Sequence, residues 1–402
     1  MPASAPSRLL DGEATAALER ARGLPADEII EAIEKAGLRG RGGAGFPLAE
    51  KIRAVRAAQN GGAGAVVVAN GYDADPDSPL TRTLLARSAA GVMRAIAIAA
   101  HAVGAREAIL YLHPEASEVR GAAESAIAAL GGDLGVAIAI ALGPGGFMGG
   151  EESAMLAVLE SRRAMARQRP PYPAVQGLNL RPTLVASVET LAWLPLIVEE
   201  QARASTKLVS VTGAVLRPGV YEVALGTQLG DILSEAGGAS AKLKGLHVGG
   251  PTGGILNATR TGTRFDFDDL RVAGTHMGSA QVRAIPMGVC IVNEAAKLFA
   301  YLAKESCAIC VPCRVGTKRV QGILEGVYSG LGRDSDLPWL EELGDHMQRF
   351  SLCGFGITAP SILRTTMREF PDDYRIHIQE QRCPEGVCTP VRSRRYETMV
   401  QP

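Results

Sequence analysis

The side chains with the most distinctive spacing in this sequence are cysteines near its C-terminal end. The segment Glu305-Ser-Cys307-Ala-Ile-Cys310-Val-Pro-Cys313-Arg314 places three thiols at two-residue gaps, and Cys353 follows about forty residues later. Three thiolates at this spacing wrap one corner of a metal cluster, and a remote fourth completes it, which is the usual way to bind a 4Fe-4S cube. A four-cysteine zinc site is the alternative, disfavoured because structural zinc prefers two paired Cys-x-x-Cys knuckles.

The remaining three cysteines are interpreted differently. Cys290 lies in an apolar run, where a lone cysteine is more often a small core residue than a ligand. Cys383-Pro-Glu-Gly-Val-Cys388 offers only two thiols, so we expect a loop clip, a site shared with a partner chain or a remnant, and no self-contained metal site. Because six of the seven cysteines lie in the last hundred residues, metal ligation in a reducing cytoplasm is favoured over disulfides.

A glycine-rich loop near the N-terminus, Gly40-Arg-Gly-Gly-Ala-Gly45, is a candidate for ligand binding. Its four glycines let the backbone approach a planar ring or a phosphate closely, although such loops are often only tight turns. It is not the dinucleotide fingerprint, because a helix and not a strand precedes it. Lys51 could supply a charge for a phosphate, with a solvated surface lysine as the alternative.

A second glycine loop, Gly143-Pro-Gly-Gly-Phe-Met-Gly-Gly-Glu151-Glu152, follows a predicted strand and precedes a helix. That position is the carboxyl edge of a sheet, where open α/β folds bind ligands. Glu151 and Glu152 could instead only stabilise the helix dipole. Tyr172, in the rigid segment Arg169-Pro-Pro-Tyr172-Pro, could stack on an aromatic ring or pack in the core.

The elements that must position these residues alternate in type. Residues 26–35, 84–103, 115–130 and 185–204 have helical patterns, and residues 65–69, 108–112 and 136–142 have strand patterns. Strands that alternate with helices predict a mainly parallel α/β sheet.

The pattern changes after this first region. Residues 208–223 form two β-type runs around an Arg217-Pro218-Gly219 turn and predict a small β-rich domain that extends to about residue 283. Residues 293–328 and 337–370 are helical and carry the cysteines, which predicts a C-terminal bundle. The polar tail after Pro371 is expected to be poorly packed.

Composition limits the class of protein. The 402 residues suggest two to four domains, and 42 basic and 42 acidic residues exclude a global attraction to nucleic acid or anionic membranes. No secretory signal is recognised at the N-terminus, and the most apolar stretches are short, carry Arg94 and His101 or are broken by glycine and proline. We therefore expect a cytoplasmic protein that reaches a membrane only through partners.

Taken together, the motifs resemble one family. Gly37-Leu-Arg-Gly-Arg-Gly-Gly-Ala-Gly-Phe46, Gly150-Glu-Glu-Ser-Ala154, Pro170-Pro-Tyr-Pro173, Val188-Glu-Thr-Leu191 and the cysteine segment occur in the same order in the NADH-oxidising subunit of respiratory complex I. Diaphorase subunits of soluble hydrogenases and formate dehydrogenases are similar. The resemblance covers nearly the whole chain.

The resemblance implies a domain order and an activity. It implies an FMN- and NADH-binding α/β domain (residues 1–205), an SLBB-type ubiquitin-like β-grasp domain (206–285), a helical 4Fe-4S bundle (286–370) and a polar tail (371–402). In the family, hydride passes from NADH to FMN, which releases single electrons to the cluster. Partners would be other subunits of a heteromeric redox complex, such as a thioredoxin-like 2Fe-2S or ferredoxin-like protein.

The resemblance also implies roles for individual residues. Glu152 would lie near the nicotinamide as the catalytic residue, and Cys307, Cys310, Cys313 and Cys353 would hold the cluster. The residues expected to contact FMN or NAD(H) are Gly40, Arg41, Gly42, Gly43, Ala44, Gly45, Phe46, Lys51, Asn70, Asp73, Asp75, Gly150, Glu151, Glu152, Arg169, Tyr172, Ala186 and Ser187.

The sequence departs from the family after the first strand and before the last helix of the FMN domain. Where the family has Asn-Ala-Asp-Glu-Gly-Glu-Pro, this chain has Asn70-Gly-Tyr72-Asp73-Ala-Asp75-Pro76, so one acid becomes Tyr72. The family's Asn-Asn pair is Ala186-Ser187 here. The lysine and phenylalanine of its Lys-Pro-Pro-Phe are Arg169 and Tyr172.

These departures affect the expected affinities. A lost hydrogen bond is worth about 0.5 to 1.5 kcal/mol, so the affinity for FMN would be lower by one or two orders of magnitude. Tyr72 could occupy space that a nicotinamide would use. An electron-relay or structural paralogue that keeps the cluster and exchanges electrons with a ferredoxin-like partner is therefore the alternative.

Overall fold

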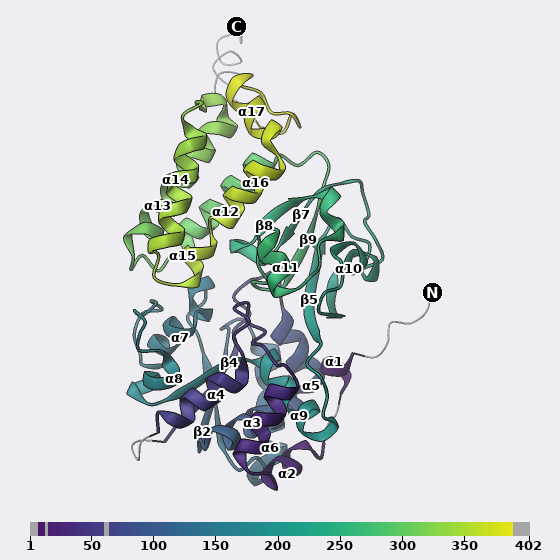
Figure 1. Ribbon diagram of the computed structural model, residues 1–402, viewed down its shortest axis with the longest axis vertical. Coiled ribbons are helices and arrows are strands. Elements are labelled where there is room, and N and C mark those ends of the chain that lie inside the picture. The colour runs from purple at the N-terminus through teal and green to yellow at the C-terminus, as the bar shows by residue number, and fades with distance from the viewer. Residues whose placement is uncertain (1–6, 13–14, 60–63, 389–402) are drawn as a thin grey trace. The chain divides into compact units, whose positions relative to one another are not determined.

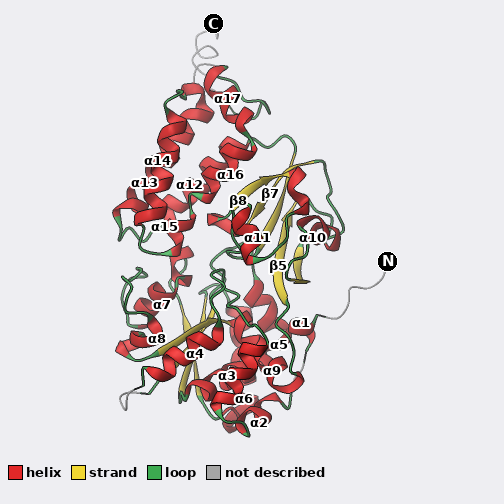
Figure 2. Ribbon diagram, viewed as in Figure 1, coloured by secondary structure: helices red, strands yellow, loops and turns green. Residues whose placement is uncertain are grey.

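The computed structural model describes residues 7–12, 15–59 and 64–388 (Figure 1). The chain divides into two compact units, one of residues 1–210 with 220–225 and the other of residues 211–219 with 226–402. Figure 2 shows that strands occur in both units and labels helices α12 to α17, which make up most of the described chain after residue 290.

The N-terminal unit contains a four-stranded parallel sheet in the order β3-β2-β1-β4. The strands are β1 (Val66–Gly71), β2 (Glu107–Leu112), β3 (Ala137–Leu142) and β4 (Thr183–Ser187). Val66, Val67 and Val68 are all buried, as expected for a strand covered on both faces. The predicted parallel α/β sheet is confirmed.

Helices connect and cover these strands. They are α1 (Arg8–Asp11), α2 (Ala17–Arg22), α3 (Ala26–Lys35), α4 (Leu48–Ala57), α5 (Leu80–Val103), α6 (Ser117–Leu130), α7 (Glu152–Leu159), α8 (Pro173–Gln176) and α9 (Val188–Glu200). Helix α5 alone among the described helices is long and apolar enough to cross a membrane. It packs against α6, α9 and β1, which accounts for its apolar composition as a core helix.

The helix predicted over residues 185–204 starts later than expected, because residues up to Ser187 belong to strand β4. Ser187 is the N-cap of α9, and its Oγ accepts a hydrogen bond from the Thr190 amide at 3.3 Å. Both the strand and the helix are buried, so their apolar residues form one continuous run. The capping hydroxyl of Ser187 marks the boundary between the two elements.

A second sheet follows, and its strands β7, β8 and β9 belong to the C-terminal unit, whereas most of β5 and β6 is counted with the N-terminal unit. A five-stranded sheet has the order β6-β5-β9-β7-β8. Its strands are β5 (Thr206–Gly213), β6 (Gly219–Ala224), β7 (Leu243–Val248), β8 (Gly254–Asn257) and β9 (Gln281–Pro286), with short helices α10 (Leu229–Glu235) and α11 (Phe267–Val272). Strand β7 pairs antiparallel with both β8 and β9. A β-rich domain was expected here.

A bundle of helices completes the C-terminal unit. They are α12 (Ile291–Glu305), α13 (Val311–Gly326), α14 (Asp336–Phe350), α15 (Gly354–Thr358), α16 (Ser361–Glu369) and α17 (Pro371–Gln379). The expectation of a poorly packed tail after Pro371 is wrong as far as residue 388, because α17 buries Tyr374, His377 and Ile378. Residues 389–402 of that predicted tail lie outside the described residues.

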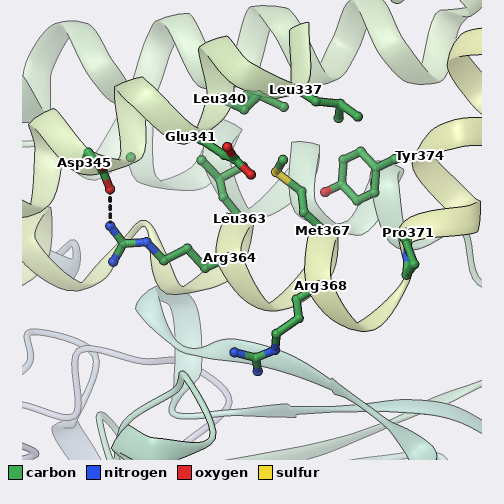
Figure 3. Close-up of a pocket in the computed structure, with 11 residues that line it drawn as sticks. Leu337, Leu340, Glu341, Asp345, Leu363, Arg364, Met367, Arg368, Pro371 and Tyr374 are labelled. Atoms are coloured by element: carbon green, nitrogen blue, oxygen red, sulfur yellow. Dashed lines mark hydrogen bonds and ion pairs between the residues drawn. The ribbon is translucent and has the colours of Figure 1, made fainter. Parts of the chain in front are cut away.

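A cavity of about 520 Å³ lies among α14, α16 and the start of α17 (Figure 3). Leu363, Met367 and Tyr374 line it, and Arg364 pairs with Asp345 at its margin at 2.6 Å. None of the predicted cofactor-binding residues lines this cavity. It therefore belongs to the packing of the bundle and not to the predicted sites.

Candidate functional site

The predicted ligand-binding segments meet at the carboxyl edge of the N-terminal sheet. Asn70 at the end of β1 lies beside Ser187 at the end of β4 in the parallel register. The Asn70 Nδ2 donates to the Gly150 carbonyl at 3.0 Å, which ties the second glycine loop to the same edge. Chain segments far apart in sequence therefore share one site region, as the topology of parallel strands requires.

The first glycine loop packs against the start of α9. The Arg41 amide donates to Thr190 Oγ1 at 2.8 Å, and a Cβ built on Gly42 would lie 3.6 Å from the Ser187 Cβ. Gly43 and Gly45 have φ of 103° and 68°, the left-handed conformation that favours glycine. Among the described residues, no acceptor bonds the amides of Gly42, Gly43 or Ala44, so these donors are available to a ligand.

The Arg41 side chain points away from this loop surface. It is 2% exposed, and its Nη2 donates to the Ala204 carbonyl at 2.7 Å. Both its amide and its side chain hold the loop against the protein, and the expected contact of Arg41 with a cofactor stays a prediction.

Four charged side chains from separate segments form one ion-pair network at this edge. Lys51 Nζ lies 2.8 Å from Glu152 Oε1 and also donates to the Val185 carbonyl at 3.0 Å. Arg169 lies 2.7 Å from Glu151 and 3.3 Å from Glu152. The alternative of a solvated surface lysine does not apply to Lys51. The network has two positive and two negative groups and is formally neutral.

The two glutamates have different structural roles. Glu151 caps α7, because one carboxylate oxygen accepts from the amides of Ser153 at 2.9 Å and Ala154 at 2.8 Å. Within the described part of the chain, Glu152 makes two ion pairs, with Lys51 and Arg169. Glu152 is consequently the acid at this edge whose removal would leave the start of α7 intact.

Two predicted aromatic residues are exposed. Phe46 is 51% exposed and Tyr172 is 57% exposed, so the alternative of a core tyrosine at position 172 is wrong. Such rings on a surface rich in backbone amides are available to stack on a planar ligand.

Asp73 and Asp75 serve the local backbone. Asp73 has φ of 43°, and its carboxylate accepts from the amides of Thr81 at 3.0 Å and Arg82 at 2.8 Å in the first turn of α5. Asp75 accepts from the Asp77 amide at 3.1 Å. Burial raises the pKa of Asp73 to about 6, against the opposing effect of these hydrogen bonds. Both carboxylates are thus occupied as caps, which argues against their expected role in binding a cofactor.

Tyr72 does not project from the edge as expected. It is 1% exposed, stacks on Tyr111 at 5.3 Å and belongs to a core cluster beneath the second glycine loop. A Cβ on Gly143 or Gly149 would lie 2.3 Å from the ring or its hydroxyl. Those glycines are therefore needed for the loop to pass over this tyrosine.

Ala186 and Ser187 replace the family's asparagine pair. Ala186 is 8% exposed on β4, and its methyl group offers no hydrogen bond. The Ser187 hydroxyl bonds Thr190 Oγ1 at 2.7 Å and caps α9. The structure thus contains no side-chain amide at either position.

In the C-terminal unit, the cysteine segment spans the gap between α12 and α13. Cys310 is the N-cap residue of α13, and Cys353 is the N-cap residue of α15. A Cβ on Gly356 would lie 3.0 Å from the Cys313 Cβ, so the turn that carries Cys353 lies against the helix that carries Cys313. Burial, with smaller effects of Cys310 and Cys307, raises the pKa of Cys313 to about 11. The turn that carries the remote fourth thiol therefore lies beside Cys313.

Sequence reasoning missed a second group of potential metal ligands. Cys290, Cys383 and Cys388 converge with His377, and their ligand atoms all lie within 4.8 Å of one another. Cys290 is buried, as expected of a core residue, but it also faces the Cys383 and Cys388 pair, which the sequence interpretation treated separately. No local spacing signals this group, because its members come from the start of α12, from α17 and from the following loop.

The residues present fit the groups that the family resemblance implies. Unpaired amides of a glycine loop beside a helix N-terminus suit a phosphate or a flavin ring. Four thiols from two adjoining turns suit an iron-sulfur cluster.

Comparisons with known proteins agree with this chemistry. Residues 33–196 match the Nuo51 FMN-binding domain, residues 208–256 match the SLBB domain, and residues 293–377 match the NADH-ubiquinone oxidoreductase-F iron-sulfur binding region. An F subunit of the NADH-quinone oxidoreductase of Rhizobium meliloti is 33% identical over 382 residues, which cover 89% of this chain and 90% of the relative.

Hydrogenase subunits are also similar. The HndC subunit of the NADP-reducing hydrogenase of Solidesulfovibrio fructosivorans is 30% identical, covering 90% of this chain and 78% of that protein. A crystal structure of NAD+-reducing NiFe hydrogenase in the H2-reduced state aligns with TM-score 0.85 and 33% identity, covering 92% of this chain and 66% of that chain. The chain belongs to the family of the F subunits of NADH-quinone oxidoreductases and their hydrogenase counterparts, the NADH-oxidising electron-input subunits that carry FMN and a 4Fe-4S cluster.

Proposed function

We propose that this electron-entry subunit oxidises NADH at the carboxyl edge of the N-terminal sheet and passes electrons to a cluster held by Cys307, Cys310, Cys313 and Cys353. The observation that carries the proposal is the meeting of the free loop amides and the ion-pair network at one sheet edge. Bound FMN would supply the conversion of a two-electron hydride into single electrons.

The first glycine loop and the start of α9 would hold the flavin. The amides of Gly42, Gly43 and Ala44 are donors for phosphate or ring oxygens, and the α9 N-terminus favours negative charge nearby. The side-chain amide of Asn70 donates to the Gly150 carbonyl at 3.0 Å. Asn70 would therefore position the Gly150 backbone and would not use that amide to contact the ligand.

The ion-pair network would bind the dinucleotide. Lys51 and Arg169 are the cations available to phosphate oxygens, and Phe46 and Tyr172 present exposed rings that can stack on adenine or nicotinamide. Glu152 holds both cations at once, so its carboxylate would fix where Lys51 and Arg169 meet a phosphate. Glu152 would then lie beside the reacting nucleotide, as the family resemblance implies.

Loss of NADH-dependent flavin bleaching in variants of this network tests the proposal. Lys51→Ala and Glu152→Ala should each lower the rate of NADH oxidation with an artificial acceptor at least tenfold. Arg53→Ala is a matched control, because Arg53 lies on the same helix α4 and pairs with Glu34, away from the network. Flavin that resists bleaching by NADH in the parent chain, or equal activity in all three variants, would contradict the proposal.

The electron-relay alternative is not favoured, since the relatives are NADH-oxidising subunits. The argument for that alternative was that Tyr72 could occupy the nicotinamide site, and it weakens because Tyr72 is packed in the core.

The relatives are subunits of multi-subunit complexes, and we propose a partner of the 2Fe-2S thioredoxin-like or ferredoxin-like type. Ile309 and Val311, 44% and 58% exposed, flank Cys310 in the sequence and support a docking surface close to the cluster ligands. A cytoplasmic location, peripheral to the membrane through partners, is proposed because clustered thiols need a reducing compartment. Co-purification of the tagged chain from its native cells tests both proposals, and recovery without a redox partner would contradict the first.

A further inference from the structure

The C-terminal unit contains a cluster of ligand-type side chains that neither redox site uses. Its members are Cys290, His377, Cys383 and Cys388, whose ligand atoms all lie within 4.8 Å of one another. These three cysteines are not in disulfide bonds. Cys290 and Cys383 are buried, and Cys388 is partly exposed. Their mutual approach is a property of the fold, because 98 residues separate the first member from the last.

We propose that these four side chains bind one zinc ion in a closed structural site. Three thiolates and one imidazole are a standard tetrahedral zinc set, in which bonds of about 2.3 Å to sulfur place the donors about 3.8 Å apart. The observed limit of 4.8 Å suits a single ion. A cluster would need to fit several irons and sulfides between the same four atoms, so the tight grouping favours zinc.

The histidine is oriented to act as a ligand. His377 Nδ1 lies 2.6 Å from the Asp373 carbonyl, one turn earlier in α17, and can only donate a proton to that oxygen. The neutral ring then carries its lone pair on Nε2, which lies 3.5 Å from Cys290 Sγ. A hydrogen bond from the remote nitrogen to a carbonyl is the usual means of fixing the tautomer of a metal-bound histidine.

The other ligands are also positioned by the backbone. Cys290 is the N-cap residue of α12, and its sulfur accepts from the Asn293 amide at 3.5 Å, which fixes the position of the side chain. Between Cys383 and Cys388, Gly386 has φ of 69° and its amide donates to the Cys383 carbonyl at 3.1 Å. This turn brings the second thiol of the loop back toward the first.

An ion-pair clamp holds the two ligand-bearing segments together. Lys244 on β7 lies 2.7 Å from Asp373 of α17 and 2.6 Å from Glu385 of the loop. Asp373 thus fixes His377 through its carbonyl and the loop through Lys244. The loop that carries Cys383 and Cys388 is consequently anchored beside His377 by contacts that do not require the metal.

The proposed ion would close the helical bundle. Cys290 begins α12 and Cys388 follows α17, so the segment between them contains all four cysteines of the proposed 4Fe-4S site. A cross-link between the ends of such a long segment restricts its unfolded state most strongly. Metal binding would release the protons of the three thiols, and no other reactant is needed.

Metal analysis of the full chain, purified anaerobically without added chelator, tests the proposal. We expect one zinc per chain beside about four irons, the stoichiometry of a single cube. Cys383→Ser/Cys388→Ser should lower zinc at least tenfold and keep the iron, whereas Cys307→Ser/Cys310→Ser should lower iron and keep the zinc. X-ray absorption at the zinc edge of the parent chain should show three sulfur ligands and one nitrogen ligand, which does not depend on any variant folding.

Histidine variants add a matched comparison. His377→Ala should lose the zinc and His377→Cys should retain it, whereas His346→Ala should have no effect, because His346 lies on the exposed face of α14. A second iron-sulfur cluster in place of zinc, zinc lost only with Cys307 and Cys310, or a disulfide between Cys383 and Cys388 in anaerobic protein would each overturn the proposal.

Discussion

The two proposed redox sites of this chain are built in opposite ways. The cluster site takes three of its four ligands from seven consecutive residues, Cys307 to Cys313, and needs the fold only to supply Cys353. The nucleotide edge takes single residues from α4, from the end of β1 and from the start of α7, among others. The cluster site can be recognised from the spacing of its cysteines in the sequence, whereas the residues of the nucleotide edge come together only in the tertiary structure.

This difference explains which substitutions each site tolerates. A cysteine ligand has no substitute, because a serine or alanine cannot supply the thiolate that iron requires. The nucleotide edge presents several donors and charges, so losing one hydrogen bond costs about 0.5 to 1.5 kcal/mol and can be offset. That is where this sequence departs from its family, at Arg169, Tyr172, Ala186 and Ser187.

The largest expected effect is at the cluster site. Cys310→Ser should abolish the visible absorbance of the cluster and most of the bound iron and sulfide, because one of four thiolate ligands is lost. Flavin retention should stay unchanged, since Cys310 belongs to the other compact unit. Iron, sulfide and flavin assays on one anaerobic preparation check this, and a stable cluster in the variant would show that another residue is the ligand.

The next effect concerns Tyr72, beneath the second glycine loop. Tyr72→Asp should destabilise the N-terminal unit by about 3 to 5 kcal/mol, because it empties a core position and buries a carboxylate without a partner. It should not increase NADH oxidation, in contrast to what the family resemblance suggests. Urea denaturation followed by tryptophan fluorescence measures the change.

Tyr72→Phe is the control for that experiment. It keeps the ring that stacks on Tyr111 and removes only the hydroxyl, so it should cost less than about 1.5 kcal/mol. Faster NADH oxidation by a well-folded Tyr72→Asp chain would mean that the ring does obstruct the nucleotide.

Tyr72 and the second group of cysteines illustrate what the sequence can reveal. Strand and helix alternation predicted the parallel sheet, and the topology then required both glycine loops to lie at one edge. The role of Tyr72 was misjudged because a family motif gives the position of a residue along the chain but not the direction of its side chain. The packing of Gly143 and Gly149 against the ring shows that the Tyr72 side chain points into the core. The group of Cys290 and His377 could not be predicted, because 87 residues separate two side chains with no common motif.

A pH effect on stability tests the burial of the Asp73 carboxylate. Its pKa is raised from an ordinary 3.8 to about 6, so between these pH values the folded chain binds a proton that the unfolded chain has lost. Stability from this group is fully present below pH 3.8 and is lost as the pH rises to about 6, by about 3 kcal/mol in total.

Asp73→Asn should flatten this part of the stability profile, since the amide does not titrate. Its single carbonyl oxygen can still accept from one of the two amides, of Thr81 or Arg82, so a moderate loss of stability at low pH is expected. Denaturant midpoints of both chains from pH 4 to pH 7 provide the measurement. Parallel profiles for the two chains would contradict the assignment.

A smaller effect is expected from restoring the asparagine pair at the end of β4. Ala186→Asn with Ser187→Asn should raise flavin affinity roughly tenfold to a hundredfold, through two hydrogen bonds of about 0.5 to 1.5 kcal/mol each. Asparagine is also a good N-cap, so α9 should still begin after residue 187. Flavin retained through gel filtration provides the assay. An unchanged affinity would indicate that the flavin does not approach β4.

The smallest effect should come from Arg169→Lys, which restores the family's residue within the ion-pair network. The guanidinium lies 2.7 Å from Glu151 and 3.3 Å from Glu152, and a lysine can keep one of these pairs well but not both. Pairs of this partly exposed kind contribute about 0 to 1 kcal/mol, so the KM for NADH should change by less than about fivefold. Because Glu151 is held by the α7 amides, the lysine should pair with Glu151 and leave Glu152 to Lys51 alone. Glu152 would then be freer to move, and kcat should fall slightly more than KM rises. If Arg169→Lys lowered NADH oxidation as much as Lys51→Ala, the planar guanidinium of Arg169 would bind the nucleotide directly. The sheet edge would then tolerate substitutions less well than expected of a site assembled from several separate segments.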